Sequence, residues 1–202
     1  MTSGVLVAFE GIDASGKSTQ ARRVAAAHDA VLTFEPGDTP LGAELRRWLL
    51  DKSEPMSPST EALLMLADRA HHVHHLIAPT LASGRSVVTD RYLASTLAYQ
   101  GYGRGVDLDA LHSATALAVG NCRPHLTVLL DVPVDVADAR RAPEASDRFE
   151  SADTGFRERV RDGFLALAAS SSDPWVVIDG TAELDVVDAA VDAALASLAW
   201  PQ

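Results

Sequence analysis

The sequence predicts an α/β fold in which a parallel sheet is flanked by helices. Short apolar runs rich in β-branched residues alternate with helical patterns along all 202 residues. Because these runs are apolar at consecutive positions, they suit strands that are covered on both faces. Strands that alternate with helices in this way form parallel sheets joined by helical crossovers, so we expect three layers, with five parallel strands in the middle.

Five segments have the composition of buried strands. Each holds mainly Val, Leu, Ile, Phe or Thr and lacks helical periodicity. The expected strands are residues 5–9, 30–34, 86–89, 126–130 and 175–178.

Helical patterns fill most of the intervals between the strands. Pro55 and Pro58 bracket a break before the longest of them, because proline is tolerated at a helix start but not within a helix. A polar stretch at 141–152 has little apolar periodicity, and we interpret it as a small mobile lid. The expected helices are residues 17–28, 40–51, 59–83, 92–100, 107–120, 152–171 and 183–199.

The composition limits the class of protein. A hydrophobic fraction of 47% suits one compact domain over residues 1–202. The net charge of −11 argues against a general nucleic-acid binder. Cys122, the single cysteine, excludes an internal disulfide and fits a reducing compartment. Neither a signal peptide nor a run of about 18 apolar residues is evident, so we expect a cytoplasmic protein without a membrane partner.

A phosphate-binding motif follows the first predicted strand. Gly11 and Gly16 lie on either side of four residues, and Lys17 and Ser18 come next. The glycines let the backbone curl so that successive N–H groups face one anion, and the following helix directs its positive end toward the same anion. Lys17 is then expected on the β- and γ-phosphates and Ser18 on Mg²⁺. The predicted nucleotide-binding residues of this P-loop are Gly11, Ile12, Asp13, Ala14, Ser15, Gly16, Lys17, Ser18 and Thr19.

Asp90 and Arg91 follow the third predicted strand directly. Ligands of open α/β sheets bind at the carboxyl ends of the strands, so Asp90 is a candidate for holding Mg²⁺ and Arg91 for a second phosphate. The alternatives are an Asp90 that caps the next helix and an Arg91 that is an ordinary surface residue.

Three further polar clusters carry weaker signals. Arg140, Arg141 and Arg148 could close over transferring phosphates as part of the lid, although a run of charge is usually a solvated face. His71 and His75 share a helix face at a spacing that can bind zinc, but without further ligands we expect a solvated or packing face. The glycine-rich residues 101–105 follow a helical pattern and are expected to form a flexible loop near the site.

With these motifs in place, the chain resembles the thymidylate kinases nearly from end to end. Besides the P-loop, the landmarks are Glu-Pro-Gly at 35–37, Ala-Asp-Arg-Ala at 67–70, Asp-Arg-Tyr at 90–92, Ala-Tyr-Gln-Gly at 98–101 and Asp-Arg-Phe-Glu at 147–150. The resemblance implies transfer of the γ-phosphate of ATP to dTMP with Mg²⁺, giving dTDP for dTTP synthesis, and it implies a homodimer.

The resemblance also assigns roles to single residues. Asp13 would contact the 3′-hydroxyl of the acceptor sugar, and Arg91 its 5′-phosphate. Lys17, Asp13, Arg91 and Arg148 would be the catalytic residues, and Arg140 and Arg141 would join the P-loop in binding ATP. The implied dTMP-binding residues are Asp13, Glu35, Met65, Arg69, Arg91, Ser95, Thr96, Tyr99 and Gln100, and the implied metal-binding residues are Ser18 and Asp90.

Three positions set this chain apart within that resemblance. Ala14 stands where some members carry a basic P-loop residue, so the chain resembles the bacterial type that delivers arginine from the lid. Phe34 replaces the usual Arg before Glu35, and Met65 replaces a Phe that would stack on thymine. Both replacements concern the acceptor pocket.

Alternative functions remain on the same fold. A related nucleotide or nucleoside kinase could take another pyrimidine acceptor such as dUMP. A GTP-dependent switch protein would need a guanine-reading Asn-Lys-x-Asp motif, which the sequence lacks. A catalytically weakened binding protein is disfavoured by the intact Lys17, Ser18, Asp90 and Arg91.

Overall fold

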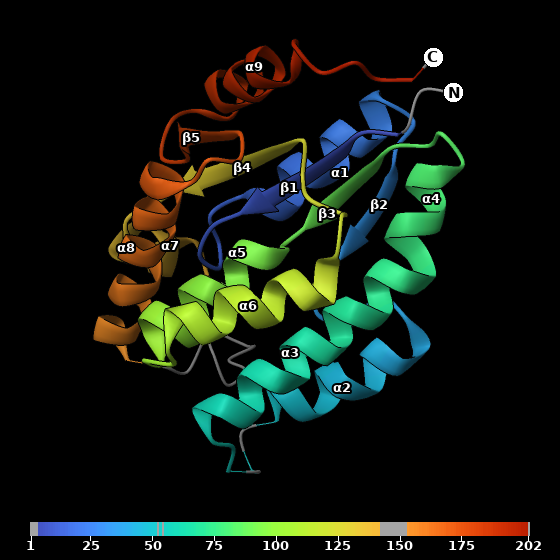
Figure 1. Ribbon diagram of the computed structural model, residues 1–202. Coiled ribbons are helices and arrows are strands. Elements are labelled where there is room, and N and C mark those ends of the chain that lie inside the picture. The colour runs from blue at the N-terminus through green and yellow to red at the C-terminus, as the bar shows by residue number, and fades with distance from the viewer. Residues whose placement is uncertain (1–3, 52, 54, 142–152, 202) are drawn as a thin grey trace.

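A five-stranded parallel sheet forms the centre of the molecule (Figure 1). The computed structural model describes residues 4–51, 53, 55–141 and 153–201. The strand order is β2-β3-β1-β4-β5. The strands are β1 Leu6–Glu10, β2 Val31–Phe34, β3 Val87–Asp90, β4 Leu126–Asp131 and β5 Trp175–Asp179. All four pairings are parallel, which confirms the predicted sheet.

Alternating side chains of β1 divide the core between the two faces of the sheet. Val7 and Phe9 pack against α1 (Lys17–Ala27) and α9 (Leu184–Leu195). Leu6 and Ala8 face the other way and join a cluster with Ile77 and Tyr92. Successive residues of a strand point to opposite faces, so a strand that is apolar at every position is buried on both.

The other predicted helices form close to their expected bounds. α2 (Pro40–Leu50) begins after Thr39, whose hydroxyl accepts a hydrogen bond from the Gly42 N–H as an N-cap. The remaining ones are α6 (Leu108–Val119) and α8 (Thr154–Ser170). None of the described helices is long and apolar enough to cross a membrane.

The expected helix at 59–83 is a continuous but irregular stretch. α3 (Pro58–His72) runs into a π-helical segment, η1 (Val73–Ile77), and continues as α4 (Ala78–Ala82). A short helix that the sequence did not predict, α7 (Val134–Arg140), follows β4. Its seven residues bury only Val134 and Ala137, which is too short a pattern to show helical periodicity.

The prediction of a flexible loop at 101–105 is wrong. α5 (Leu93–Thr96) continues into a second π-helical segment, η2 (Leu97–Gly103), so the first glycines of that loop lie in a helix. A Cβ atom on Gly101 would lie 2.5 Å from Leu108 Cδ2, and one on Gly103 would lie 2.6 Å from Phe156 Cε2. These glycines therefore serve close packing rather than flexibility. Most of the predicted lid, residues 142–152, lies outside the described residues.

Candidate active site

The P-loop connects the carboxyl end of β1 to the amino end of α1. Gly11 and Gly16 have φ angles of +142° and +95°, which glycine adopts at little cost. A Cβ atom on Gly11 would also lie 2.6 Å from the Leu130 carbonyl oxygen. The loop that the motif predicts therefore requires glycine here for both conformation and space.

Lys17 is a buried cation within this loop. Its side chain is 6% exposed, and its Nζ lies 3.3 Å from the Ile12 carbonyl oxygen and 3.6 Å from Asp13 Oδ1. Burial, together with the neighbouring charge of Arg91, lowers the pKa of Lys17. Such a cation is poorly solvated by the protein alone, so an added anion would improve its surroundings.

Ser18 and Asp90 meet at the carboxyl ends of the neighbouring strands β1 and β3. The Ser18 hydroxyl donates a hydrogen bond to Asp90 Oδ2, while the buried Asp90 Oδ1 has no hydrogen-bond partner among the described residues. Asp90 does not cap α5, because the N-cap position is Tyr92 and no side chain bonds there. A hydroxyl and a carboxylate with a spare oxygen form a donor set that fits Mg²⁺.

Arg91 is aimed into the same crevice from the residue after β3. Its backbone is left-handed at φ 70°, which is rare for a residue other than glycine. Nη2 donates to Asp13 Oδ1 at 2.6 Å and to the Tyr99 hydroxyl at 3.1 Å, and Nη1 donates to Ser95 Oγ at 3.0 Å. Burial by itself would raise the pKa of Asp13, but the charges of Arg91 and Lys17 outweigh it and lower that pKa.

A second buried network lies on the other side of the crevice. Arg69 Nε donates to Glu35 Oε2 at 2.7 Å, and His72 Nδ1 lies 2.9 Å from Glu35 Oε1. The other two nitrogens of Arg69 donate to Thr96 Oγ1 and to the Tyr92 carbonyl oxygen. All of these side chains are almost fully buried, so Arg69 is fixed in one position.

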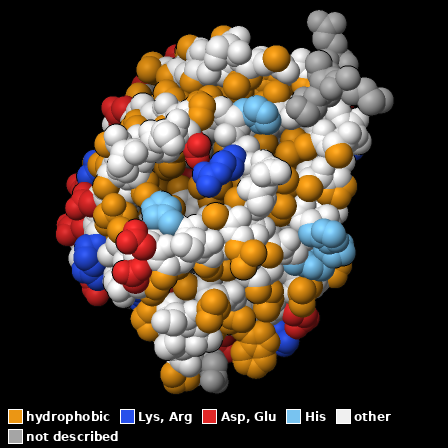
Figure 2. Space-filling model, in the orientation of Figure 1, with side chains coloured by type: hydrophobic (Ala, Val, Ile, Leu, Met, Phe, Trp, Pro, Cys, Tyr) orange, Lys and Arg blue, Asp and Glu red, His pale blue; other side chains and the backbone are white. Residues whose placement is uncertain are grey.

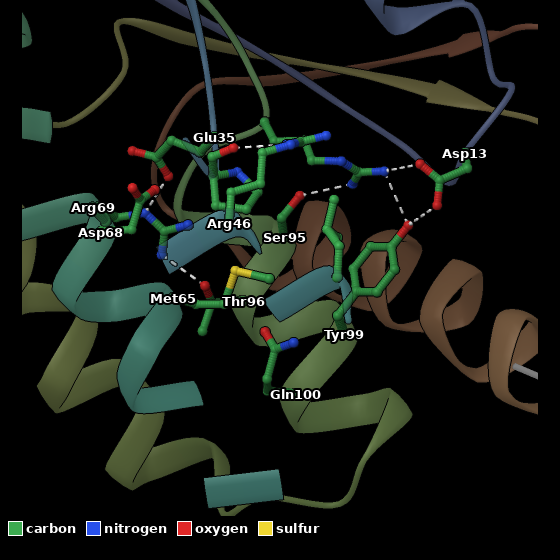
Figure 3. A pocket seen from close by; sticks show the side chains of 13 residues that line it. Asp13, Glu35, Arg46, Met65, Asp68, Arg69, Ser95, Thr96, Tyr99 and Gln100 are labelled. Carbon is green, nitrogen blue, oxygen red and sulfur yellow. Dashed lines mark hydrogen bonds and ion pairs between the residues drawn. The ribbon is translucent and has the colours of Figure 1, made fainter. Parts of the chain in front are cut away.

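The two networks enclose a cavity of about 90 Å³ (Figure 3). All nine residues that the sequence predicts for the acceptor nucleotide line it: Asp13, Glu35, Met65, Arg69, Arg91, Ser95, Thr96, Tyr99 and Gln100. Figure 3 shows Asp13 and Tyr99 on one side and Glu35, Asp68 and Arg69 on the other. These residues come from segments spread over nearly ninety positions of the chain.

A wider cavity of about 300 Å³ adjoins the first on the side of the P-loop. Lys17, Ser18 and Asp90 line it. The two cavities share Asp13, Glu35, Arg46 and Arg91. A single crevice therefore connects the predicted donor loop with the predicted acceptor pocket.

The predicted lid arginines are only partly within the described structure. Arg140 Nη1 donates to the Gly180 carbonyl oxygen at 2.9 Å, and a Cβ atom on Gly180 would lie 3.2 Å from the Ser15 carbonyl oxygen. Arg141 lines a small cavity together with Ile12 and Asp13. Both arginines thus lie beside the P-loop, whereas Arg148 lies outside the described residues.

The small cavity has four lining residues that the sequence did not predict: Pro36, Arg46, Leu50 and Asp68. Pro36 and Asp68 are chain neighbours of Glu35 and Arg69, in motifs that the sequence analysis names. This proximity could have predicted that they line the same cavity. Arg46 and Leu50 lie on α2 without a local motif. The Arg46 guanidinium lies 5.7 Å from the ring centre of Phe34, so this cation comes close to the position where Phe34 replaces the usual arginine.

The histidines of α3 and η1 separate into two groups. His72 is buried and contacts Glu35 and Thr33, while the rings of His71 and His75 lie nearer the surface, tilted by 41° with their centres 4.0 Å apart. Within the part of the chain that the structure describes, no three His, Cys, Asp or Glu side chains are grouped to hold a metal ion.

Comparison with known proteins gives one consistent result. The family model for thymidylate kinase matches residues 9–191. The thymidylate kinase of Geobacter sulfurreducens is 44% identical over 201 residues, covering 93% of this chain and 94% of the relative. That of Desulforudis audaxviator is 42% identical over 203 residues, covering 97% and 92%. The crystal structure of thymidylate kinase from Ehrlichia chaffeensis superposes with a TM-score of 0.78 at 31% identity, covering 96% of this chain and 99% of the other.

Proposed function

Because this chain belongs to the thymidylate kinase family, we propose that its crevice holds dTMP in the small cavity and ATP on the P-loop. The enzyme is an ATP-dependent phosphotransferase that acts on dTMP. The observation that carries the arrangement of the substrates is the single cavity lined by all nine predicted acceptor residues and joined to the P-loop cavity.

The reaction is an in-line displacement at the γ-phosphorus of ATP. An oxygen of the dTMP phosphate forms the new bond, the bond to the β-phosphate oxygen breaks, and ADP leaves while dTDP forms. The protein positions both phosphates and offsets their charge, since phosphoryl transfer needs little covalent help. Lys17 serves the donor phosphates, and Arg91 serves the acceptor phosphate.

Asp13 links the two halves of the site. Its Oδ1 lies 3.6 Å from Lys17 Nζ and 2.6 Å from Arg91 Nη2, and the residue lines both cavities. An acceptor sugar hydroxyl that donates to Asp13 would lie beside the guanidinium that holds the acceptor phosphate. This geometry supports the role of Asp13 in orienting the acceptor.

Ser18 and Asp90 are the residues that would hold Mg²⁺. The unpartnered Asp90 Oδ1 and the adjacent Ser18 hydroxyl support this assignment. When bound, Mg²⁺ would neutralise charge on the β- and γ-phosphates. Arg140 and Arg141 would approach the same phosphates from beside the P-loop, with Arg148 joining them from the lid.

A coupled assay over a panel of monophosphates tests the acceptor. With ATP and Mg²⁺, we expect kcat/KM for dTMP to exceed that for dCMP and dGMP. The value for dUMP measures how strongly the site selects the thymine methyl group when Met65 replaces an aromatic ring. An enzyme that prefers dUMP would favour the alternative acceptor, and equal rates for all four nucleotides would contradict the thymidylate assignment.

The assembly and location of the enzyme are further parts of the proposal. Leu63 on α3 and Leu117 on α6 are 65% and 87% exposed, and Figure 2 shows hydrophobic side chains spread over the face that carries these helices. Such a face supports a homodimer, because a second copy would remove it from water. The free thiol of Cys122 supports a cytoplasmic location.

A further inference from the structure

Gln100 contributes a side-chain amide to the acceptor cavity. The residue is 1% exposed, and Figure 3 shows its amide below Met65 and Thr96. An amide presents a donor at nitrogen and an acceptor at oxygen, and the two are nearly the same size. The orientation of this amide therefore decides which hydrogen-bonding edge of a base the cavity can accept.

Glu61 fixes that orientation from behind the cavity. It lies in the first turn of α3, is 2% exposed, and accepts a hydrogen bond from Gln100 Nε2 at 2.9 Å through Oε1. Arg104 pairs with the same carboxylate, with Nε 3.3 Å from Oε1 and Nη2 3.3 Å from Oε2. A carboxylate has no proton to donate, so the atom of Gln100 that faces it must be the nitrogen.

The carbonyl oxygen of Gln100 is consequently available to the cavity. Gln100 lines the cavity and its nitrogen is taken by Glu61, so the oxygen is the atom of this amide that is left to meet a ligand. An exposed amide could rotate to suit any base, but here the reversed orientation would place two acceptors against each other in a buried site, which is costly.

Arg69 supplies hydrogen-bond donors to the same cavity. Its Nη1 and Nη2 each bond to the protein through one N–H, to Thr96 and to Tyr92. Each of these nitrogens carries a second N–H, and the guanidinium lines the cavity. The cavity thus offers donors from Arg69 and an acceptor from Gln100.

This pattern matches one class of pyrimidine. Thymine and uracil have an N3–H donor flanked by two carbonyl acceptors, whereas cytosine has an acceptor at N3. An acceptor fixed on Gln100 is satisfied by the N3–H and repelled by the N3 lone pair. We propose that Glu61, held by Arg104, is a positioning residue that fixes the Gln100 amide and thereby selects imide pyrimidines over cytosine. This inference rests on the proposed function, in which the acceptor base occupies this cavity.

The substitution Glu61→Gln tests the proposal. An amide at position 61 can offer either an acceptor or a donor to Gln100, so the Gln100 amide is no longer held in one orientation. The measurement is kcat/KM for dTMP and for dCMP with saturating ATP. We expect the ratio of dTMP to dCMP to fall by about tenfold or more, which is the worth of one well-placed hydrogen bond.

The matched control is Asp188→Asn. Asp188 Oδ1 also accepts from a buried glutamine amide, that of Gln20 at 2.6 Å, and also pairs with an arginine, Arg23 at 3.4 Å. The same acid-to-amide change is thus made at another carboxylate that pairs with a glutamine and an arginine, although Asp188 is more exposed than Glu61 and lies between α1 and α9, away from the acceptor cavity. The nucleotide ratio of this variant should equal that of the unmodified enzyme.

A second variant, Glu61→Asp, separates positioning from a structural role. It retains a group that can only accept, so the nucleotide ratio should stay within about threefold of the original even where overall activity falls. The inference is overturned if a folded Glu61→Gln variant keeps the original ratio, or if Glu61→Asp loses the ratio. If the unmodified enzyme does not phosphorylate dTMP, the proposed function fails instead, before either variant is measured.

Discussion

Arg91 shows at the scale of one residue how the chain accepts strain to position a charge. Its left-handed backbone, at φ 70°, costs on the order of 1 kcal/mol or more for a residue with a Cβ atom. The conformation is held by the bonds of its guanidinium to Asp13, Ser95 and the Gly11 carbonyl oxygen. The result is an oriented guanidinium, 14% exposed, that lines both cavities.

Removing either of the two central cations should abolish most of the activity while leaving the fold intact. We expect Lys17→Ala and Arg91→Ala each to lower kcat by at least about a hundredfold, the usual effect of losing one charge-stabilising group. Steady-state kinetics and circular dichroism measure the two parts of this prediction. A folded variant with nearly normal kcat would contradict the assigned role of the residue concerned.

Asp68 is a buried carboxyl whose ionisation works against the fold. Burial and the neighbouring Glu35 carboxylate raise the pKa of Asp68 to about 6. Because this pKa is higher in the folded than in the unfolded chain, ionised Asp68 destabilises the protein above about pH 6. The penalty disappears as the pH falls toward the unfolded pKa of 3.8.

Asp68→Asn should therefore stabilise the protein in a pH-dependent way. We expect a gain on the order of 2 kcal/mol at pH 8, seen as a Tm higher by about 5 °C, that shrinks to roughly a third of this near pH 4.5. Thermal unfolding at both pH values measures it. Asp109→Asn, at an exposed position of α6, is the control, and an equal gain of the Asp68 variant at both pH values would refute the electrostatic cause.

At the scale of elements, the contact between α8 and η2 shapes the cavity that we propose for dTMP. η2 carries Tyr99 and Gln100, both of which line the cavity. Gly163 on α8 lets the two elements approach closely, since a Cβ atom there would lie 2.6 Å from Tyr102 Cγ. The glycine, which weakens α8 as a helix, is explained by this approach.

Gly163→Ala should disturb the acceptor site through this contact. The added methyl group must push Tyr102, and overpacking of this kind costs about 1–3 kcal/mol, which exceeds the gain in helix propensity. We expect a lower Tm and a KM that rises for dTMP but not for ATP. The exposed Asp162→Ala on the same helix is the control, and an unchanged KM for dTMP would refute the coupling.

At the scale of the whole molecule, the apolar face of α3 and α6 predicts the assembly. Light scattering should give twice the chain mass of 21.4 kDa. Leu117→Glu places a charge on this face and should shift the enzyme toward the monomer, because a charge at the centre of an apolar interface is costly. Leu184→Glu on α9, where the leucine is 61% exposed, should leave the mass unchanged. A monomeric unmodified enzyme would contradict the dimer.

The sheet, most of the helices and the P-loop could be predicted from the sequence, because these features depend on residues that are neighbours in the chain. An apolar run of about five residues is enough to identify a strand. The two glycines followed by Lys17 specify a loop whose geometry depends only on these neighbouring residues. The resemblance extended this to Glu35, Arg69 and Gln100. Even so, the glycine-rich pattern wrongly predicted a loop at Gly101 and Gly103, and no pattern predicted α7.

The way in which distant side chains orient one another is visible only in the folded molecule. Nothing in the local sequence connects Glu61 with Gln100, which are 39 positions apart, or Arg46 with the crevice. Likewise, the glycines of η2 are explained only by Leu108 and Phe156, which reach them from other helices. Such contacts arise from the packing of whole elements, and packing depends on the entire core rather than on any single stretch of the chain.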